Sequence, residues 1–414
     1  MGVTVLAVAA VAWVLAANVD LYPHQRLTDL PVYESAARHI ESGQVPYRDF
    51  SFEYPPLAAV LIMIARLLPL PFAAGFSLLM FMALCATALG VVATAHALEL
   101  GPRRQMAAGL VVAVLPLLLG DWIATRYDLT VAALVAWLSW AAVTLRWRAA
   151  WTLLAVAVAL KLVPVVLVPA LLVWHRRHRD GRQAQAAAGL AAVGVVGTFL
   201  PFLVLSPDGL WRMFSYHLDR PLQIESLGAA YMLGLHALAD IGLRVETTFG
   251  SQNLVGTGPQ VIAAIGTMLS VVGIVAVWRS LVVSLNRSDP IDAARIFVSA
   301  IAATLVVVVT TGKVLSPQFV LWLVPCALVV VGRFGRAAFA TTVAVLVATQ
   351  LYFPAHYWDL VALQPGAIAL LVLRDALLVV LVALLWPRPG YSAAMLNGVI
   401  ERASPSPPAS TSAP

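Results

Sequence analysis

Residues 72–98 read FAAGFSLLMFMALCATALGVVATAHAL, and this stretch decides the class of fold. It contains no Asp, Glu, Lys or Arg, and it exceeds the roughly 20 residues that a helix needs to cross a bilayer. Similar apolar runs recur along the whole chain, which is 61% hydrophobic and only 11% charged, with a mean hydropathy of +0.89. An ordinary soluble domain carries about 25% charged residues and could not hide this much apolar surface from water. The composition therefore indicates a multi-pass membrane protein.

Short basic clusters separate the apolar runs, as at Arg103–Arg104 and at residues 175–182. Cytoplasmic loops of membrane proteins carry an excess of Lys and Arg, so the net charge of +6 indicates orientation rather than nucleic-acid binding. Keeping the clusters inside predicts an all-α protein with about 12 transmembrane helices and both termini in the cytoplasm. If all clusters are cytoplasmic, each interval between them must contain an even number of crossings. Residues 55–70 and 227–243 are therefore expected to lie on or dip into the membrane without crossing it. Because Pro164 disrupts helical hydrogen bonding, two short helices are expected to meet beside it.

Residues 1–402 are expected to form one membrane-embedded domain. Residues 403–414, rich in Ser, Pro and Ala, are expected to form a disordered cytoplasmic tail. Residues 3–19 lack a preceding basic segment and are interpreted as an uncleaved first helix. Cys85 and Cys326 fall inside apolar runs, and no Cys or His spacing is typical of a metal site. We therefore expect no metal and no cofactor.

The first loop, about residues 20–56, is large and is expected outside. Tyr33 and three apolar residues after it follow the spacing i, i+3, i+4, i+7, which predicts an amphipathic helix along the membrane surface. Asp29 stands just before this helix. A carboxylate beside apolar surface is a candidate general base that takes a proton from an attacking hydroxyl. The alternative, which does not exclude the first, is a helix N-cap ahead of Pro31.

Isolated cations on the predicted outer face are a second signal. Lys161 lies between long apolar stretches, and Lys313 lies in a polar turn between two apolar runs, where a charge indicates function. The alternative for Lys161 is a side chain that snorkels from a helix end. Arg220 lies in the densest outer polar run, where it could bind a phosphate with two N–H groups or pair with neighbouring charges. Arg126 and Asp128 are interpreted as a structural pair at a helix start.

In this order along the chain, these residues resemble the bacterial membrane glycosyltransferases of the GT-C superfamily. The closest resemblance is to glycosyltransferase family 87, the polyprenol-phosphate-mannose-dependent mannosyltransferases. It rests on Asp29 and Tyr33, Gly43-Gln44-Val45-Pro46-Tyr47, Glu53-Tyr54-Pro55-Pro56-Leu57, Leu160-Lys161-Leu162-Val163-Pro164, Asp219-Arg220-Pro221-Leu222-Gln223-Ile224-Glu225-Ser226 and Lys313-Val314-Leu315-Ser316-Pro317-Gln318. Each piece alone is a weak signal, whereas the ordered set, which extends to about Pro325, is fairly specific.

The resemblance implies inverting transfer of a hexose, most often mannose, from a polyprenyl-phosphate donor to a lipid or glycan acceptor. The reaction would take place on the extracytoplasmic side of a bacterial plasma membrane, with membrane lipids as further partners, and the role of base would fall on Asp29. Cations would stabilise the charge that grows on the leaving phosphate. The candidates to bind the donor phosphate are Arg220, Lys161, Lys313 and His217. The candidate substrate contacts are Tyr33, Glu53, Tyr54, Glu225 and Gln318.

A multi-spanning transporter or a flippase of a lipid-linked sugar is the alternative function. Many helices and a basic cytoplasmic side fit it equally well. Transporters, however, tend to show related halves and intramembrane charges near the midplane. This sequence has no evident halves, and its unusual charges fall at predicted outer helix ends. It also shows no P-loop or dinucleotide-binding fingerprint, which agrees with a lipid-linked donor.

Overall fold

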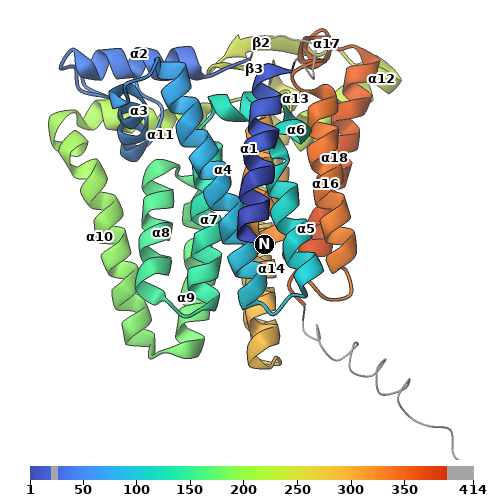
Figure 1. Ribbon diagram of the computed structural model, residues 1–414. Coiled ribbons are helices and arrows are strands. Elements are labelled where there is room, and N and C mark those ends of the chain that lie inside the picture. The colour runs from blue at the N-terminus through green and yellow to red at the C-terminus, as the bar shows by residue number, and fades with distance from the viewer. Residues whose placement is uncertain (20–26, 389–414) are drawn as a thin grey trace, which may run out of the picture.

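The computed structural model describes residues 1–19 and 27–388. Long helices stand side by side in a bundle, and short helices gather with a small sheet at one end, here called the capped end (Figure 1). The short helices at this end are α2 (Leu30–Glu41), α3 (Pro56–Leu67), α11 (Pro207–Asp219), α12 (Leu227–Ala239) and α17 (Tyr357–Val361). The expected disordered tail, residues 403–414, and part of the expected first loop lie outside the described residues.

The bundle itself consists of helices whose axes run between the capped end and the opposite end (Figure 1). They are α1 (Gly2–Asn18), α4 (Phe72–Ala97), α5 (Pro102–Ala113), α6 (Leu115–Leu119), α7 (Asp128–Val143), α8 (Trp147–Leu160), α9 (Val168–His178), α10 (Gly181–Leu205), α13 (Thr257–Leu285), α14 (Pro290–Thr311), α15 (Val320–Ala327), α16 (Gly335–Tyr352) and α18 (Pro365–Leu385). Among the described residues, five helices are long and apolar enough to cross a membrane, namely α4, α10, α13, α14 and α18. The prediction of a mostly helical, multi-pass membrane protein is confirmed.

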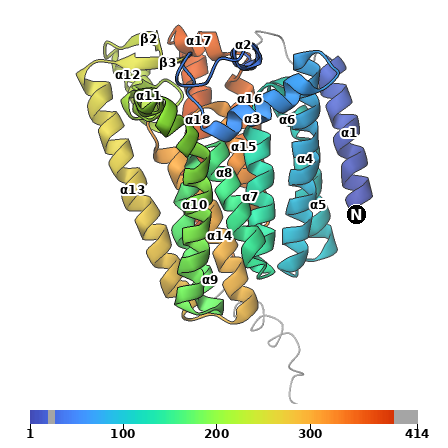
Figure 2. The same ribbon diagram turned by 90° about the vertical axis from the view of Figure 1, so that its left-hand side faces the viewer.

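The surroundings of the long helices differ in a way that fits lipid as the solvent. In α14, 89% of an apolar stretch of 18 residues is buried inside the protein, whereas the corresponding share is 0% in α10 and 11% in α13. Figure 2 shows α10 and α13 on the outside of the bundle. Apolar faces this large are not tolerated in water, but they are the ordinary surface of a helix in a bilayer.

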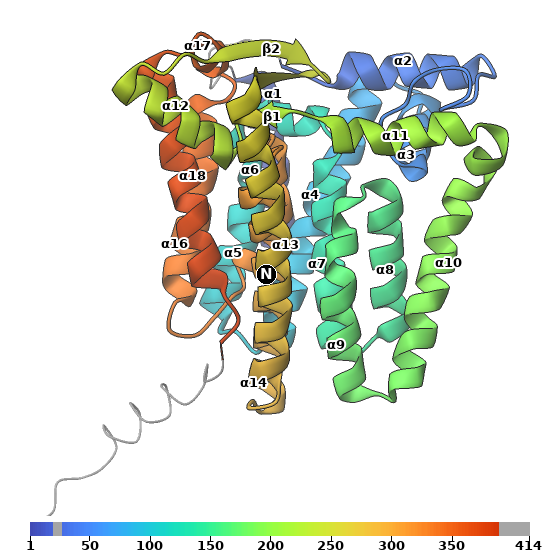
Figure 3. The ribbon, with the colours of Figure 1, turned by 180° about the vertical axis from the view of Figure 1, so that it is seen from behind.

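The predicted break beside Pro164 is present. Helix α8 ends at Leu160, Lys161 takes an extended backbone conformation, and the short 3-10 helix η2 (Val163–Leu167) leads into α9. The two segments expected to stay at the surface form α3, with 12 residues, and α12, with 13 residues. A helix of that length spans only about 20 Å, and both lie at the capped end (Figures 1 and 3).

The amphipathic helix predicted in the first loop is α2. It buries Tyr33, Ala36 and Ala37 and ends beside Gly43, whose φ of +83° lies in the left-handed region that glycine adopts freely. The helix lies across the top of α3 and α4 in Figure 1. Because this face of α2 is buried, the residues just before the helix are held at the capped end of the bundle.

The description as all-α needs one correction, because the capped end holds a three-stranded antiparallel sheet of order β1-β3-β2. The strands are β1 (Leu222–Gln223), β2 (Arg244–Thr248) and β3 (Ser251–Val255). Strands β2 and β3 form a hairpin whose two turn residues, Phe249 and Gly250, both have positive φ. Such turns are normally signalled by Asn-Gly or Asp-Gly. Because this turn has phenylalanine in its first position, the sequence does not predict the hairpin.

Close contact between α13 and α14 depends on Gly266, and this generates a prediction. A Cβ at Gly266 would lie 2.7 Å from the backbone oxygen of Thr311, whereas nothing lies within 4 Å of a Cβ at Gly197 in α10. Backbone cannot yield as a flexible side chain does, so Gly266→Ala should destabilise the protein by about 1–3 kcal/mol. Thermal unfolding in detergent should show a lower midpoint for Gly266→Ala and none of this loss for Gly197→Ala. Equal midpoints would contradict the packing argument.

Candidate active site

A cavity of about 630 Å³ lies beneath the capped end, between segments from distant parts of the chain. It contains every residue that the sequence analysis selected for the site. These are Asp29, Tyr33, Glu53, Tyr54, Lys161, His217, Arg220, Glu225, Lys313 and Gln318. The selected residues thus line one cavity, although their individual roles stay predictions.

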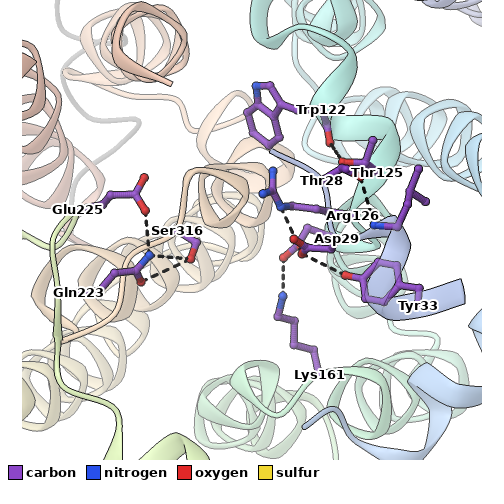
Figure 4. A network of polar contacts seen from close by, with 12 residues as sticks. Thr28, Asp29, Tyr33, Trp122, Thr125, Arg126, Lys161, Gln223, Glu225 and Ser316 are labelled. Carbon is purple, nitrogen blue, oxygen red and sulfur yellow. Dashed lines mark hydrogen bonds and ion pairs between the residues drawn. The ribbon is translucent and has the colours of Figure 1, made fainter. Parts of the chain in front are cut away.

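Asp29 occupies the N-cap position of α2, but its side chain makes no capping hydrogen bond. The hydroxyl of Thr28 instead accepts the backbone N–H of Leu30 at 3.1 Å. The Asp29 carboxylate accepts from the hydroxyl of Tyr33 and from Nε of Arg126, each at 3.3 Å, as Figure 4 shows. The capping position is therefore confirmed and the capping bond is not, because the carboxylate is used in the cavity.

Arg126 is a site residue that the sequence analysis assigned to a different partner. It pairs with Asp29, while Asp128 pairs with Lys161. Burial disfavours its charged form, but the neighbouring charge of Asp29 outweighs this and the pKa of Arg126 is raised. Its guanidinium lies 5.7 Å from the ring centroid of Trp122 and 5.4 Å from that of Phe353. An arginine so close to a predicted base orients that carboxylate and holds a permanent positive charge in the cavity.

Lys161 is held by an ion pair and by aromatic rings. Its Nζ donates to Oδ1 of Asp128 at 2.7 Å, and the same oxygen accepts from Nε1 of Trp322 at 2.8 Å. Its ammonium lies 4.9 to 5.1 Å from the ring centroids of Tyr127, Phe319 and Trp322. The lysine does sit at a helix end, as the snorkelling alternative requires, but it turns into the cavity. The carboxylate and the rings allow a charge to remain among apolar helices.

A second group of cations lies on the wall formed by α11 and the turn after α14. Arg220 donates through Nη2 to the hydroxyl of Ser251 at 3.1 Å, and Lys313 donates to the backbone oxygen of Leu218. Burial lowers the pKa of Lys313, and the charge of Arg220 adds to that effect. Burial also lowers the pKa of His217, which therefore contributes a neutral ring to the site.

Glu225 is the buried carboxyl group of the cavity. It is 2% exposed and accepts from Nε2 of Gln223 at 2.8 Å and from the hydroxyl of Tyr352 at 3.0 Å. Gln223 also contacts the hydroxyl of Ser316 (Figure 4), and the backbone oxygen of Glu225 accepts from Arg374 at 2.7 Å. Burial raises the pKa of Glu225 to about 7. A fraction of this carboxyl is therefore protonated at neutral pH.

Some buried polar atoms of the cavity wall have no hydrogen-bond partner among the described residues. They are Nη1 of Arg126, the hydroxyl of Tyr127, Nε of Arg220 and Oε1 of Gln318. Buried polar groups in native proteins are nearly always hydrogen-bonded, so a cluster of such atoms marks a place for a polar ligand. Within residues 1–19 and 27–388, no three His, Cys, Asp or Glu side chains group as metal ligands.

The lining of the cavity also includes apolar side chains. They are Leu162 and Val163 beside the break after α8 and Val308 and Val309 of α14. The cavity therefore combines charged, hydrogen-bonding groups with apolar residues of the bundle. Such a combination fits a ligand with a polar head and an apolar chain.

Comparison with known proteins adds one family and two distant structures. The model of glycosyltransferase family 87 matches residues 52–310, which is more than half of the chain. The crystal structure of ArnT from Cupriavidus metallidurans bound to undecaprenyl phosphate aligns at 16% identity with a TM-score of 0.48, covering 98% of this chain and 81% of that chain. The apo form of the same protein aligns with the same identity and coverage and a TM-score of 0.42. No curated protein sequence matches.

The buried carboxyl of Glu225 predicts a dependence of stability on pH. Its pKa rises from an ordinary 4.5 to about 7, so the folded state retains a proton that the unfolded chain releases within this range. Stability should therefore fall as the pH rises from 4.5 to 7, by up to about 3 kcal/mol for this group. Thermal unfolding at pH 5 and pH 8 should show a smaller decrease for Glu225→Gln than for the wild type. An identical decrease in both would show that Glu225 does not titrate in this range.

Proposed function

The chain belongs to glycosyltransferase family 87, and from this membership we propose that it transfers mannose from a polyprenyl-phosphate donor to a lipid or glycan acceptor. Membership confirms the family resemblance found in the sequence, and the sugar, donor and acceptor are our proposal. The observation that carries it is a cavity in which an oriented carboxylate, several cations and apolar lining residues occur together. A lipid-linked sugar phosphate offers the matching groups.

The donor would place its phosphate beside the cations and its chain along the apolar lining residues. Nε of Arg220 and Nη1 of Arg126 are buried and free to donate, and Lys313 lies close to Arg220. Arginine binds phosphate oxygens with several N–H groups in fixed geometry. Lys161 would act mainly through its charge, because Asp128 already accepts from its Nζ. Val308, Val309, Leu162 and Val163 line the side of the cavity on which a polyprenyl chain would lie.

The reaction needs a base for the acceptor and a sink for the charge of the leaving group. Asp29 would take the proton of the acceptor hydroxyl, whose oxygen then bonds to the anomeric carbon. The bond from that carbon to the phosphate oxygen breaks, and the phosphate leaves with the electron pair. Attack from the face opposite the phosphate inverts the anomeric centre. Arg126 and Tyr33 hold Asp29 in place, and the cations stabilise the leaving phosphate as its charge grows.

The proposed topology places the capped end outside the cell, with about 12 crossings and both termini inside. Successive bundle segments run in opposite directions between the two ends, with α5 and α6 together forming one segment (Figures 1 and 3). The basic residues at the end of α9, including Arg176 and Arg177, lie opposite the capped end. Since basic loops remain in the cytoplasm, the cavity would face the outer side. We treat residues 1–402 as one domain with a large first outer loop.

The first test removes the proposed base. In vesicles supplied with synthetic polyprenyl-phosphomannose and a lipid extract as acceptor, Asp29→Asn should lower the transfer rate at least about 100-fold. The change keeps the size of the side chain and its ability to accept from Tyr33 and Arg126. Asp121→Asn is the matched control, because Asp121 is exposed at the start of η1 (Asp121–Thr125) and outside the cavity. Thermal unfolding checks that both variants fold.

Other outcomes of this assay have definite meanings. Full transfer by Asp29→Asn would assign the base to another carboxylate, and Glu53→Gln would be the next variant. If the wild type transfers no sugar but moves a labelled lipid across the bilayer, the protein is a flippase and the proposed reaction is wrong.

A second test concerns the donor phosphate. Arg220→Gln should raise the KM for the donor or lower kcat by a combined factor of about 10 to 100, because a charged hydrogen-bond donor is lost. Arg244→Gln, on β2 of the same capped end and outside the cavity, should retain wild-type kinetics. Initial rates at varied donor concentration measure the effect. Unchanged kinetics in Arg220→Gln would remove Arg220 from the phosphate site.

A further inference from the structure

A second cleft of about 280 Å³ lies at the capped end, between residues 47–53 and α11. It shares Glu53 and Tyr216 with the main cavity. Its other lining residues are Tyr47, Arg48, Asp49, Phe50, Ser51, Phe52, Gly209, Arg212 and Met213. The mechanism proposed above assigns no role to this cleft.

The cleft is built by two close contacts between residues 47–53 and α11. At one end, a Cβ at Gly209 would lie 1.9 Å from the backbone oxygen of Tyr47, so only glycine permits this approach. The same oxygen accepts from the hydroxyl of Ser206 at 3.3 Å. At the other end, His217 lies 3.0 Å from the backbone oxygen of Glu53 and donates to it. The segment is therefore fixed at both ends, and the space between the contacts is part of the fold.

The lining groups have the chemistry that recognises sugar hydroxyls. Arg48 forms an ion pair of 2.8 Å with Asp49, and the guanidinium of Arg212 is exposed without a partner among the described residues. Carboxylates accept from hydroxyl groups, and guanidinium groups donate to them. The charges of Arg48, Arg212, Asp49 and Glu53 sum to zero. A neutral polyhydroxylated ligand fits this balance better than an anion.

The shared wall connects the cleft to the predicted base. Glu53 lies at the boundary between the two spaces, and Tyr54 follows it in the chain. The ring of Tyr54 packs edge-on against that of Tyr33, with centroids 5.6 Å apart, and the hydroxyl of Tyr33 donates to Asp29. A ligand bound in the cleft therefore lies only one layer of side chains, Glu53 and Tyr216, away from the cavity that holds Asp29.

We propose that this cleft is the acceptor subsite, which binds a neutral glycan through its hydroxyl groups and presents one of them past Glu53 to Asp29. The inference rests on the proposed transferase function and adds to it the class of acceptor. Arg212 and Ser51 would contact sugar units remote from the reacting hydroxyl, and Glu53 and Tyr216 would contact the unit that enters the cavity.

The first experiment measures occupancy of the cleft without any turnover. Ser51→Cys in a Cys85→Ser background gives one accessible thiol in the cleft, because the remaining Cys326 is buried. At four times its Kd, α-linked mannotriose should slow labelling by a water-soluble maleimide about fivefold, whereas glycerol phosphate should not. Ser42→Cys, exposed at the end of α2 and outside both cavities, is the matched control and should show no protection. Equal labelling with and without mannotriose overturns the proposal, as does protection by glycerol phosphate alone.

The second experiment separates acceptor binding from donor binding. Arg212→Ala should raise the KM for a mannose-containing lipid extract about tenfold, with the donor KM unchanged, because one charged donor to the acceptor is lost. Arg244→Ala should leave both constants unchanged. An unchanged acceptor KM in Arg212→Ala contradicts the subsite. If the wild type turns over no donor, the proposed function fails, and the labelling experiment still decides whether the cleft binds glycan.

Discussion

Nζ of Lys161 and Oδ1 of Asp128 lie 2.7 Å apart at the point where α7, α8 and α15 meet. Two charges surrounded by apolar helices are stable only when they are paired and hydrogen-bonded. The pair fixes the break after α8 against the first turn of α7, and Trp322 of α15 donates to the same carboxylate oxygen. Asp128, Lys161 and Trp322 all line the cavity beneath the capped end, so the pair fixes part of the cavity wall.

Four carboxylates line the same cavity, and three of them, Asp29, Asp128 and Glu225, differ in properties because their surroundings differ. Asp128 is satisfied by Lys161 and Trp322, so it serves the structure. Asp29 is oriented by Tyr33 and Arg126 and remains 30% exposed in its side chain, which suits proton exchange with an incoming hydroxyl. Glu225 is buried and has a pKa of about 7, so its charge varies near neutral pH. Environment rather than residue type therefore separates a structural carboxylate, a candidate base and a titrating group.

The capped end contributes polar residues to the charged cavity and forms the second cleft beside it. Helix α11 supplies His217 at its end, and Arg220 follows it directly, while the same helix closes over residues 47–53 to form the second cleft. Arg374 of α18 reaches the backbone oxygen of Glu225 and lies 2.6 Å from the carboxylate of Asp375, with both side chains almost fully buried. Buried charge in a spanning helix thus holds a loop of the cavity wall. The bundle and the elements of the capped end are in this way one unit around the cavity.

The sequence by itself determined the membrane class, the break beside Pro164, the amphipathic helix α2 and ten of the residues that line the cavity. Hydropathy, proline geometry and helical periodicity act within one segment, so they are visible without a partner. Only the tertiary structure decided that Arg126 pairs with Asp29, that Glu225 is buried beside Tyr352 and Arg374, and that α11 and residues 47–53 enclose a cleft. Each of these depends on segments far apart in the chain. The physical reason is that pairing and burial are properties of neighbours, and neighbours are set by packing.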